Sequence, residues 1–584
     1  GYGGDRLDVC IFRLKKRGDD ILMLQPFMQD IVHGNSGGVS DIVKQKGEGA
    51  VVECLKVVAR DEYEALVDIT DLLEKNESYF GLGRFEMDLG IGTYVPESSF
   101  LKEVCPAAKS LTIRFVRTCM SVSPFPDPSV KSEPTRWEYG VSLCLLDKIP
   151  MEGRMIDGRV GYFTNKVRNY DNAVYDKGEC EFISRWKLVP HREQLEAYLG
   201  GDLVEPIKPI VFYIDKQIPT WLYPYVKRAV EAWQPAFERA GFKNAILARP
   251  EPMREEDSVF SVDNARYAYI SYKTSPLKNA YGPSSVDPRS GEILCSHIGI
   301  FNSISDLVQE LYFCQAGALD SLARRIVLPD TLLGKLIQYV VCHEVGHALG
   351  LKHNFRGSSV FSTASLRDKE FLRNNGHGAS IMDYMRFNYA VQPEDDVSLD
   401  DLIPRVGEYD CFAIEWGYRY FPSEEVARKR LWEWVDSMAQ NPLYQYGGID
   451  KTDVFCQSED LGFNQMEVNE LGIKNMQRLQ MPIWMKEQDE AAKKVMSSRY
   501  RGMLIRYQGY INQVLRNLWG VTEKRDSLGQ KWEFVGMERQ QVAYDFLEQY
   551  AFTPQHWLFR QDMFSYYGID ERMNWESICW WIIG

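Results

Sequence analysis

Apolar and polar residues alternate with a period of two through much of the first 200 residues. Residues 111–115 place an apolar side chain at every second position, and residues 137–144 repeat the pattern. This alternation is typical of a β-strand that buries one face. The glycine-rich segment 34–38 has the composition of a loop between such strands. We therefore predict a β-rich N-terminal domain over residues 1–203.

The pattern changes after Pro206 and Pro209. Residues 210–214 form an uninterrupted apolar run of strand length, and apolar residues then recur at helical spacing over residues 222–240. Pro235 falls inside this helical stretch, where a proline is expected to kink the helix. Further short strands are expected at residues 267–270 and 293–294. Strands and helices therefore alternate in this part of the chain.

Beyond about residue 425 the apolar positions mostly follow the helical period. Met503, Tyr507 and Val514 fall on one helix face, and Gly520 follows as a stop signal. No internal repeat is visible. We predict an α+β multidomain chain with a β-rich domain over 1–203, a domain of alternating strands and helices over 204–425 and a mostly helical domain over 426–584.

The composition narrows the class of protein. Hydrophobic residues make up 45% and charged residues 26%, and 584 residues exceed what one hydrophobic core organises. The formal net charge of −14 argues against nucleic-acid binding, because phosphate recognition needs a positive surface. No apolar run is long enough to span a membrane. The chain begins at Gly1 without a signal-like segment, so we expect a processed or trimmed product with any export signal outside this sequence.

The candidate chemistry lies in residues 343–353, which read HEVGHALGLKH. This segment ends an apolar run with helical spacing that begins near Leu332. His343 and His347 are four residues apart, so they share one helix face and can reach the same ion. Catalytic zinc sites commonly use three protein ligands and leave the fourth position for water. Glu344 lies one residue round the helix, where it can hydrogen-bond that water instead of binding the metal.

Gly350 explains how His353 can serve as the third ligand. A helix continued past His347 would carry residue 353 away from the ion. A glycine can adopt a positive φ, end the helix and turn the chain back, so that His353 approaches from the loop side. We therefore predict a Zn²⁺ cofactor held by His343, His347 and His353.

This extended motif resembles that of the metzincin zinc metallopeptidases, whose second signature is a methionine turn beneath the metal. Residues 380–384, SIMDY, look like that turn. The resemblance implies a metzincin-like catalytic domain, with a twisted mixed sheet and an active-site helix. It also implies that Met382 forms an apolar floor under the histidines, and that Tyr384 binds the metal or donates to the tetrahedral intermediate. A buried structural tyrosine would fit Tyr384 equally well.

Other segments narrow the resemblance to a group of large bacterial zinc-dependent metalloproteases of unknown physiological substrate. The similar segments are HNF after the zinc motif, MRFNY after the methionine turn, and residues 159–163, 287–293 and 408–418. The match spans most of the chain and is most specific around the metal. Proteins of this group are usually exported. The resemblance therefore implies an extracytoplasmic location, which means periplasmic, cell-surface or secreted.

These observations predict a zinc-dependent endopeptidase that acts on a protein or peptide substrate. Glu344 would take a proton from a zinc-activated water and later pass it to the leaving amine. The metal, with Tyr384 as a candidate helper, would stabilise the oxyanion. By analogy with metzincins, the substrate is expected to lie extended against an edge strand near residues 293–300. The sequence does not indicate the oligomeric state.

Three alternatives stay open at this point. The substrate can be a non-standard amide, such as a cell-wall peptide or a glycopeptide. The chain can be a catalytically silent surface binding protein, although core packing accounts for its 13% aromatic residues. The first domain can be inhibitory, chaperoning or substrate-binding. We find no cysteine switch and no calcium loop of a known pattern, so latency and calcium dependence are undecided. His377, in the loop before the methionine turn, is a candidate to line the cleft.

Overall fold

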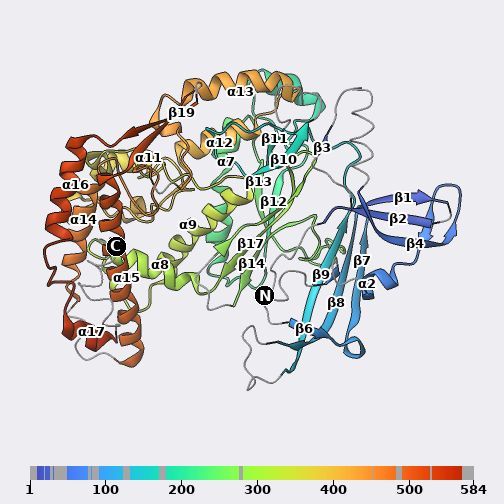
Figure 1. Cartoon of the computed structure of the whole chain (residues 1–584), viewed down its shortest axis with the longest axis horizontal. Coiled ribbons are helices and arrows are strands. Elements are labelled where there is room, and N and C mark those ends of the chain that lie inside the picture. Colours follow the sequence, from blue (N-terminus) through green and yellow to red (C-terminus); the bar gives the residue numbers. More distant parts are fainter. Residues whose placement is uncertain are drawn as a thin grey trace.

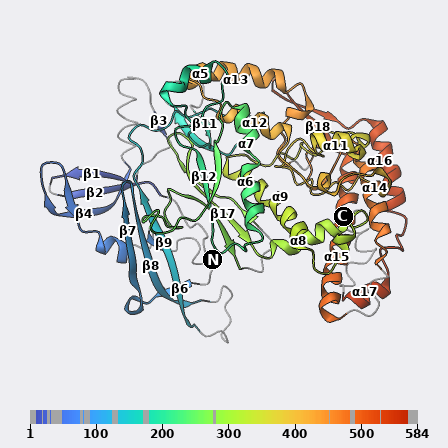
Figure 2. The same cartoon turned by 180° about the vertical axis from the view of Figure 1, so that it is seen from behind.

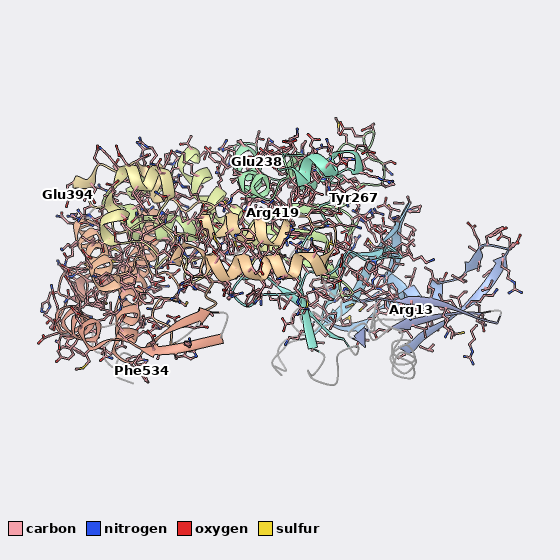
Figure 3. All side chains as sticks on the ribbon, turned by 90° about the horizontal axis from the view of Figure 1, so that it is seen from above. Arg13, Glu238, Tyr267, Glu394, Arg419 and Phe534 are labelled. Carbon is pink, nitrogen blue, oxygen red and sulfur yellow. The ribbon has the colours of Figure 1, made fainter. Side chains whose placement is uncertain are left out.

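The computed structural model describes most of the chain, and every structural statement below concerns the described residues. They are residues 10–18, 20–25, 30–31, 49–75, 80–81, 91–122, 132–169, 179–274, 280–449, 452–481, 489–526 and 529–568. The loop predicted at residues 34–38 lies outside them. The molecule is elongated, with N-terminal sheets at one end and helices at the other (Figure 1). Accordingly, Arg13 and Phe534 lie near opposite ends of the long axis (Figure 3).

The N-terminal region is built from small sheets, as the alternating pattern predicts. The order β1-β2-β4-β5 forms one sheet, β6-β8-β7 with β9 against β8 forms the second, and β11-β10-β3 forms the third. Ile113 and Phe115 of the second sheet are buried in a small core with Leu72 and Leu73, so the alternation marks the buried face. The elements are β1 (Arg13–Arg17), β2 (Asp20–Gln25), β3 (Asp30–Ile31), β4 (Ala50–Arg60), β5 (Ala65–Val67), α2 (Thr70–Lys75), β6 (Ile91–Tyr94), β7 (Phe100–Ala107), β8 (Ser110–Ser121), β9 (Pro134–Cys144), β10 (Thr164–Asn169) and β11 (Glu179–Ile183).

A mixed sheet forms the centre of the molecule. Its order is β13-β12-β14-β17-β15, and β16 also pairs with β17. The first four strands are mutually parallel, whereas β15 and β16 run antiparallel to β17. The strands are β12 (Ile210–Ile214), β13 (Ile246–Pro250), β14 (Ala268–Lys273), β15 (Ala280–Tyr281), β16 (Ser284–Asp287) and β17 (Glu292–Phe301). The predicted edge strand near residues 293–300 is therefore wrong: β17 has partners on both sides, and β15 and β16 form the edge.

Two helices replace the single kinked helix predicted over residues 222–240. They are α6 (Tyr223–Glu231) and α7 (Gln234–Arg239). Pro235 lies in the first turn of α7, where backbone N–H groups have no acceptor within the helix. Its missing N–H therefore removes no hydrogen bond, and the proline begins a helix instead of bending one. α6 packs against β12 and against α9 (Asp330–Ala348), which itself contacts β17 (Figure 2). The helices thus hold α9 against the central sheet.

Helices dominate the C-terminal part, as the sequence predicts. α15 is the longest, and Met503, Tyr507 and Val514 from the predicted stripe are buried in its core. The helices α8 (Ile304–Ala316), α10 (Thr363–Arg367), α11 (Lys369–Asn375) and α12 (Glu408–Tyr418) precede this part in the sequence. The part itself contains α13 (Glu424–Met438), α14 (Gln465–Arg478), α15 (Glu490–Leu515), α16 (Met537–Tyr550) and α17 (Gln561–Tyr567), and a hairpin joins β18 (Val521–Asp526) to β19 (Gly529–Phe534). Among the described residues, no helix is both long and apolar enough to cross a membrane.

The largest hydrophobic core surrounds α9. It draws on Val160, Tyr162, Ile183 and Trp186 as well as on the central sheet and on α12 and α13. A fully buried Trp233 lies between α6 and α7 and donates its indole N–H to the carbonyl of Cys342 on α9. Residues from the N-terminal region thus share one core with the helix that carries the candidate metal ligands.

Candidate metal centre

The helix α9 carries His343, Glu344 and His347 and ends just after them. Its last turn stops at Leu349, and Gly350 follows with φ of +97°. Only glycine adopts this backbone conformation without strain, so the predicted role of Gly350 as a helix-ending turn is confirmed. A methyl group on Gly350 would also overlap the Ser184 carbonyl, so both the backbone conformation and the lack of space exclude a side chain here.

The turn after Gly350 brings His353 back to the two helical histidines. The ligating nitrogens of His343, His347 and His353 all lie within 4.8 Å of one another. The Nε2 atoms of His347 and His353 are 3.1 Å apart, close to the separation of about 3.3 Å between two nitrogens on a tetrahedral zinc. His343 is buried while His347 and His353 are half-buried, so the cluster opens on one side.

Backbone carbonyls orient two of the imidazoles. The Nδ1 atom of His343 lies 2.7 Å from the Ile381 carbonyl oxygen, and that of His347 lies 2.8 Å from the Leu351 carbonyl oxygen. Each carbonyl oxygen accepts a hydrogen bond from the Nδ1–H of its imidazole, which leaves the lone pair on Nε2. Nε2 of His343 is buried and has no hydrogen-bond partner. This orphaned acceptor beside two further imidazoles is the donor set that zinc prefers, and the site fits the metal.

Burial keeps these imidazoles neutral. It lowers the pKa of His343 well below its ordinary value, with a smaller contribution from the neighbouring His347 and His353. Burial also lowers the pKa of His347, and it lowers the pKa of His353 to about 4. A histidine must be neutral to bind a metal, so the surroundings favour the binding form at physiological pH.

The Glu344 carboxyl is buried, and no cationic side chain among the described residues offsets the effect of burial on its pKa. Burial raises the pKa of this carboxyl to about 8. A divalent cation in the histidine cluster acts in the opposite direction, because positive charge favours the carboxylate. Burial raises the pKa of the Tyr384 phenol most, and the charge of Glu344 raises that pKa further. A carboxyl with these properties is suited to accept and return a proton.

The predicted methionine turn lies under the histidines. Met382 is fully buried, and a methyl group on Gly346 of α9 would overlap its sulfur. Asp410 of α12 holds the turn in place: its carboxylate accepts hydrogen bonds from Ser380 Oγ and from the backbone N–H of Ile381, each at 2.6 Å. The carbonyl of Met382 accepts from the N–H of Asn354 at 3.1 Å, next to the third histidine.

Tyr384 packs against two of the predicted ligands. Its ring centroid is 5.2 Å from that of His343 and 4.5 Å from that of His353. Burial raises the pKa of its phenol, so the O–H stays protonated. The Arg386 guanidinium lies 4.4 Å from the Tyr384 ring centroid and bonds Glu459 at 3.0 Å. A second arginine, Arg506 of α15, bonds the same carboxylate at 2.6 Å.

Sequence reasoning missed several residues at this centre. Asp410 and Arg386 stand in segments that resemble the bacterial group, but nothing in the local pattern assigns them a contact. Phe163 is a further such residue, since its ring centroid is 5.8 Å from that of His347 although 184 positions separate them. His377 is buried, and its Nε2 atom lies 3.1 Å from the Arg386 carbonyl oxygen, which favours a structural role over a position that lines the cleft.

Comparison with known families agrees with this geometry. Residues 325–577 match the model of a family described as Met-zincin. These residues are similar to the Met-zincin family. Residues 4–191 match a second family, described only as a domain of unknown function. No curated protein and no solved structure matched the chain. The Met-zincin match begins before α9 and contains all three histidines and the methionine turn.

At the level of the family, the Met-zincin match supports a zinc metallopeptidase. The predicted resemblance is confirmed, and so is the predicted fold class, with a β-rich N-terminal region and a helical C-terminal region. Zinc is the cofactor that both the family and the histidine cluster support. His343, His347 and His353 are the residues that would hold it.

Proposed function

We propose that this protein is a zinc-dependent endopeptidase in which Glu344 is the general base. The observation that carries the proposal is the arrangement on one side of α9. Three neutral imidazoles come together at one point, and Glu344, a buried carboxyl, follows His343 directly on the helix that carries His343 and His347. Peptide hydrolysis needs a proton acceptor beside the attacking water, and Glu344 is the carboxyl that adjoins the triad.

Zinc, when bound, supplies Lewis acidity that favours deprotonation of water and polarises a carbonyl group. Glu344 accepts one proton from the attacking water, while the water oxygen forms a bond to the carbonyl carbon of the substrate. The bond between that carbon and the amide nitrogen then breaks. Glu344 returns the proton to the nitrogen, so that the products are a carboxyl group and a free amine.

We propose that Tyr384 assists at the carbonyl oxygen. Its phenol keeps its proton, and its ring is held between the imidazole of His353 and the guanidinium of Arg386. An O–H donor fixed in this way stabilises negative charge as it develops on the substrate oxygen. The arginine adds positive charge behind the ring.

The edge of the central sheet supports a path for an extended peptide. β15 and β16 form the outer strands of the sheet, and Gly282 lies between them. A methyl group on Gly282 would lie 2.9 Å from the carbonyl oxygen of Glu344, so this edge passes close to the proposed base. An extended substrate can add as a further strand at the edge of a sheet. Such pairing would present an internal peptide bond to the metal.

A variant with a neutral isostere tests the proposed base. Glu344→Gln should retain zinc but lose at least about 1,000-fold in kcat/KM, since the proton acceptor is gone. Glu433→Gln on the surface of α13 is the matched control and should keep full activity; its side chain is 57% exposed. Full activity of Glu344→Gln would overturn the assignment.

The products distinguish an endopeptidase from the other hydrolases. Wild-type enzyme is incubated with a peptide library, a set of cell-wall peptides and a set of glycopeptides, and the fragments are identified by mass spectrometry. The proposal expects cuts at internal bonds of ordinary peptides. Removal of single terminal residues, or cleavage of cell-wall fragments or glycopeptides alone, would contradict it. Absence of cleavage of any set, with zinc bound, would favour a binding protein.

We also propose that the protein acts outside the cytoplasm. The resemblance to a group of exported bacterial metalloproteases supports this location. Fractionation of producing cells into cytoplasm, periplasm, surface and medium, with detection by antibody, tests it. Recovery in the cytoplasm alone would contradict the proposal.

A further inference from the structure

A strand-like segment of the N-terminal region pairs with the zinc-binding loop. Tyr162 and Leu351 form an antiparallel bridge. The N–H of Phe163 donates to the Gly350 carbonyl at 2.8 Å, and the N–H of Lys352 donates to the Gly161 carbonyl at 2.9 Å. Residues 161–163 thus pair, in the manner of a β-strand, with the loop that carries His353. This segment belongs to the region that matches the domain of unknown function.

Further bonds fix this segment from its other side. The Phe163 carbonyl accepts from the N–H of Ser184 at 2.7 Å, so the backbone of Phe163 is held on both sides. The phenol of the preceding Tyr162 is buried and donates to the Ala413 carbonyl of α12 at 2.8 Å. The indole of Trp186 donates to the Ala348 carbonyl at the end of α9. Phe163 therefore projects from a rigid support.

The side chain of Phe163 stays accessible although its backbone is held. The side chain is 43% exposed, and its ring lies at an angle of 51° to the ring of His347. The next residues of the strand are polar, and Thr164 and Lys166 both contact Glu181. Phe163 is thus an exposed apolar side chain beside the half-buried His347.

We propose that Phe163 is a specificity residue whose ring forms an apolar wall of the substrate cleft beside His347. It would take an aliphatic or aromatic side chain of the substrate next to the bond that is cut. A fixed aromatic ring loses little entropy when it is covered, and such covering removes apolar area from water. This inference rests on the proposed peptidase function, and it gives the N-terminal region a part in substrate binding.

The same contacts bear on the alternative of a removable pro-region. Residues 161–163 and 184–186 hold the loop around Gly350 and the end of α9 in place. Cleavage between the predicted domains near residues 200–209 would leave these contacts intact. An N-terminal region that departs on activation would uncover the zinc loop. The inferred role therefore requires this region in the active enzyme.

Selectivity of the full chain provides the first test. Wild type, Phe163→Ala and Phe163→Leu are assayed on a peptide library, and kcat/KM is measured for the best sequences. Phe163→Ala should lower kcat/KM about tenfold for substrates with a large apolar side chain beside the cut, and less than about twofold for those with alanine there. Phe163→Leu should keep most of the preference. Phe552→Ala, at a residue that is 52% exposed in the C-terminal region, is the control and should match wild type.

Binding without catalysis provides the second test. Zinc-free Glu344→Gln protein, with and without Phe163→Ala, is titrated with labelled octapeptides that differ only in a central Phe, Leu or Ala. Affinity for the Phe and Leu peptides should fall about tenfold in the double variant, with equal thermal midpoints for both proteins. An equal loss for all three peptides, or no loss, would overturn the inference. If wild type cleaves nothing, the proposed function fails, while this titration still decides the role of Phe163.

Discussion

The Nδ1 atom of His343 lies 2.7 Å from the carbonyl oxygen of Ile381, the residue that precedes Met382. This bond joins the active-site helix to the methionine turn. The carboxylate of Asp410 holds the methionine turn, because it accepts a hydrogen bond from the N–H of Ile381 at 2.6 Å. A partner of this kind fixes the tautomer and the direction of a ligating imidazole. Changes in the turn should therefore reach the metal.

The contact between α9 and the turn gives a first prediction at Gly346. A methyl group there would overlap the Met382 sulfur and lie 2.8 Å from the Trp233 ring. Gly346→Ala should lower the free energy of unfolding by about 1–3 kcal/mol, because the packed residues must move. It should also weaken zinc binding about tenfold or more through the displaced turn. Thermal unfolding and a zinc competition titration measure the two effects.

Gly509 is the matched control for this substitution. It lies inside α15, and a methyl group there meets no atom within 4 Å. Gly509→Ala should leave zinc binding unchanged and raise stability by about 0.5–1 kcal/mol, as alanine does in an open helix position. Equal behaviour of both variants would show that the floor beneath the histidines is not tightly packed.

Removal of zinc should lower thermal stability. A ligand that binds the folded chain alone stabilises it, by about 2.7 kcal/mol at a hundredfold excess over its Kd. Treatment with a chelator should lower the thermal midpoint, and added zinc should restore it. His353→Ala should lose this response, whereas His556→Ala, at an exposed position, should keep it. A zinc response that survives in His353→Ala would remove that residue from the ligand set.

Tyr384 can be tested by removing its hydroxyl alone. Tyr384→Phe should lower kcat about 10- to 100-fold with little change in KM, since a donor to the developing charge is lost. Its zinc content should equal that of wild type. Tyr544→Phe, at a residue that is 51% exposed, is the control. A fall in zinc content in Tyr384→Phe would instead indicate a ligand, and unchanged kinetics would indicate a structural tyrosine.

Glu459 gives a prediction about pH. Burial opposes its ionisation, but the guanidiniums of Arg506 and Arg386 outweigh burial and lower its pKa to about 2. An acid with a depressed pKa stabilises the fold above its unfolded pKa of about 4.3 and loses this contribution as pH falls toward 2. Glu459→Gln should therefore cost about 3 kcal/mol at pH 7 and progressively less below pH 4. Chemical unfolding of both proteins between pH 2 and pH 7 measures the difference.

An exposed glutamate separates this effect from general acid denaturation. Glu433→Gln should follow the wild-type curve at every pH, because its carboxylate is 57% exposed and only weakly paired with Lys429. A constant difference between wild type and Glu459→Gln across the whole range would mean that the two arginines do not depend on the charge of Glu459. That result would contradict the prediction.

The fold could be predicted in outline but not in its pairings. Alternation identified the buried face of β8, and the helical period identified the stripe that includes Met503 and Tyr507. The edge of the central sheet was assigned to β17 and proved to be β15 and β16. A short antiparallel pair carries little periodic signal, so its position depends on which strand it meets. The domain boundaries at residues 203 and 425 stay predictions.

The sequence by itself determined the chemistry of the metal centre, because that chemistry depends on residues that are only a few positions apart. The spacing of four positions from His343 to His347 defines one helix face, and Gly350 allows the turn that returns His353. Only the tertiary structure decided which side chains surround the metal centre. Phe163 lies beside His347, and Arg386 contacts both Tyr384 and Glu459. These neighbours come from segments far apart in the chain. Their meeting depends on how whole elements pack around one core, and no local pattern records it.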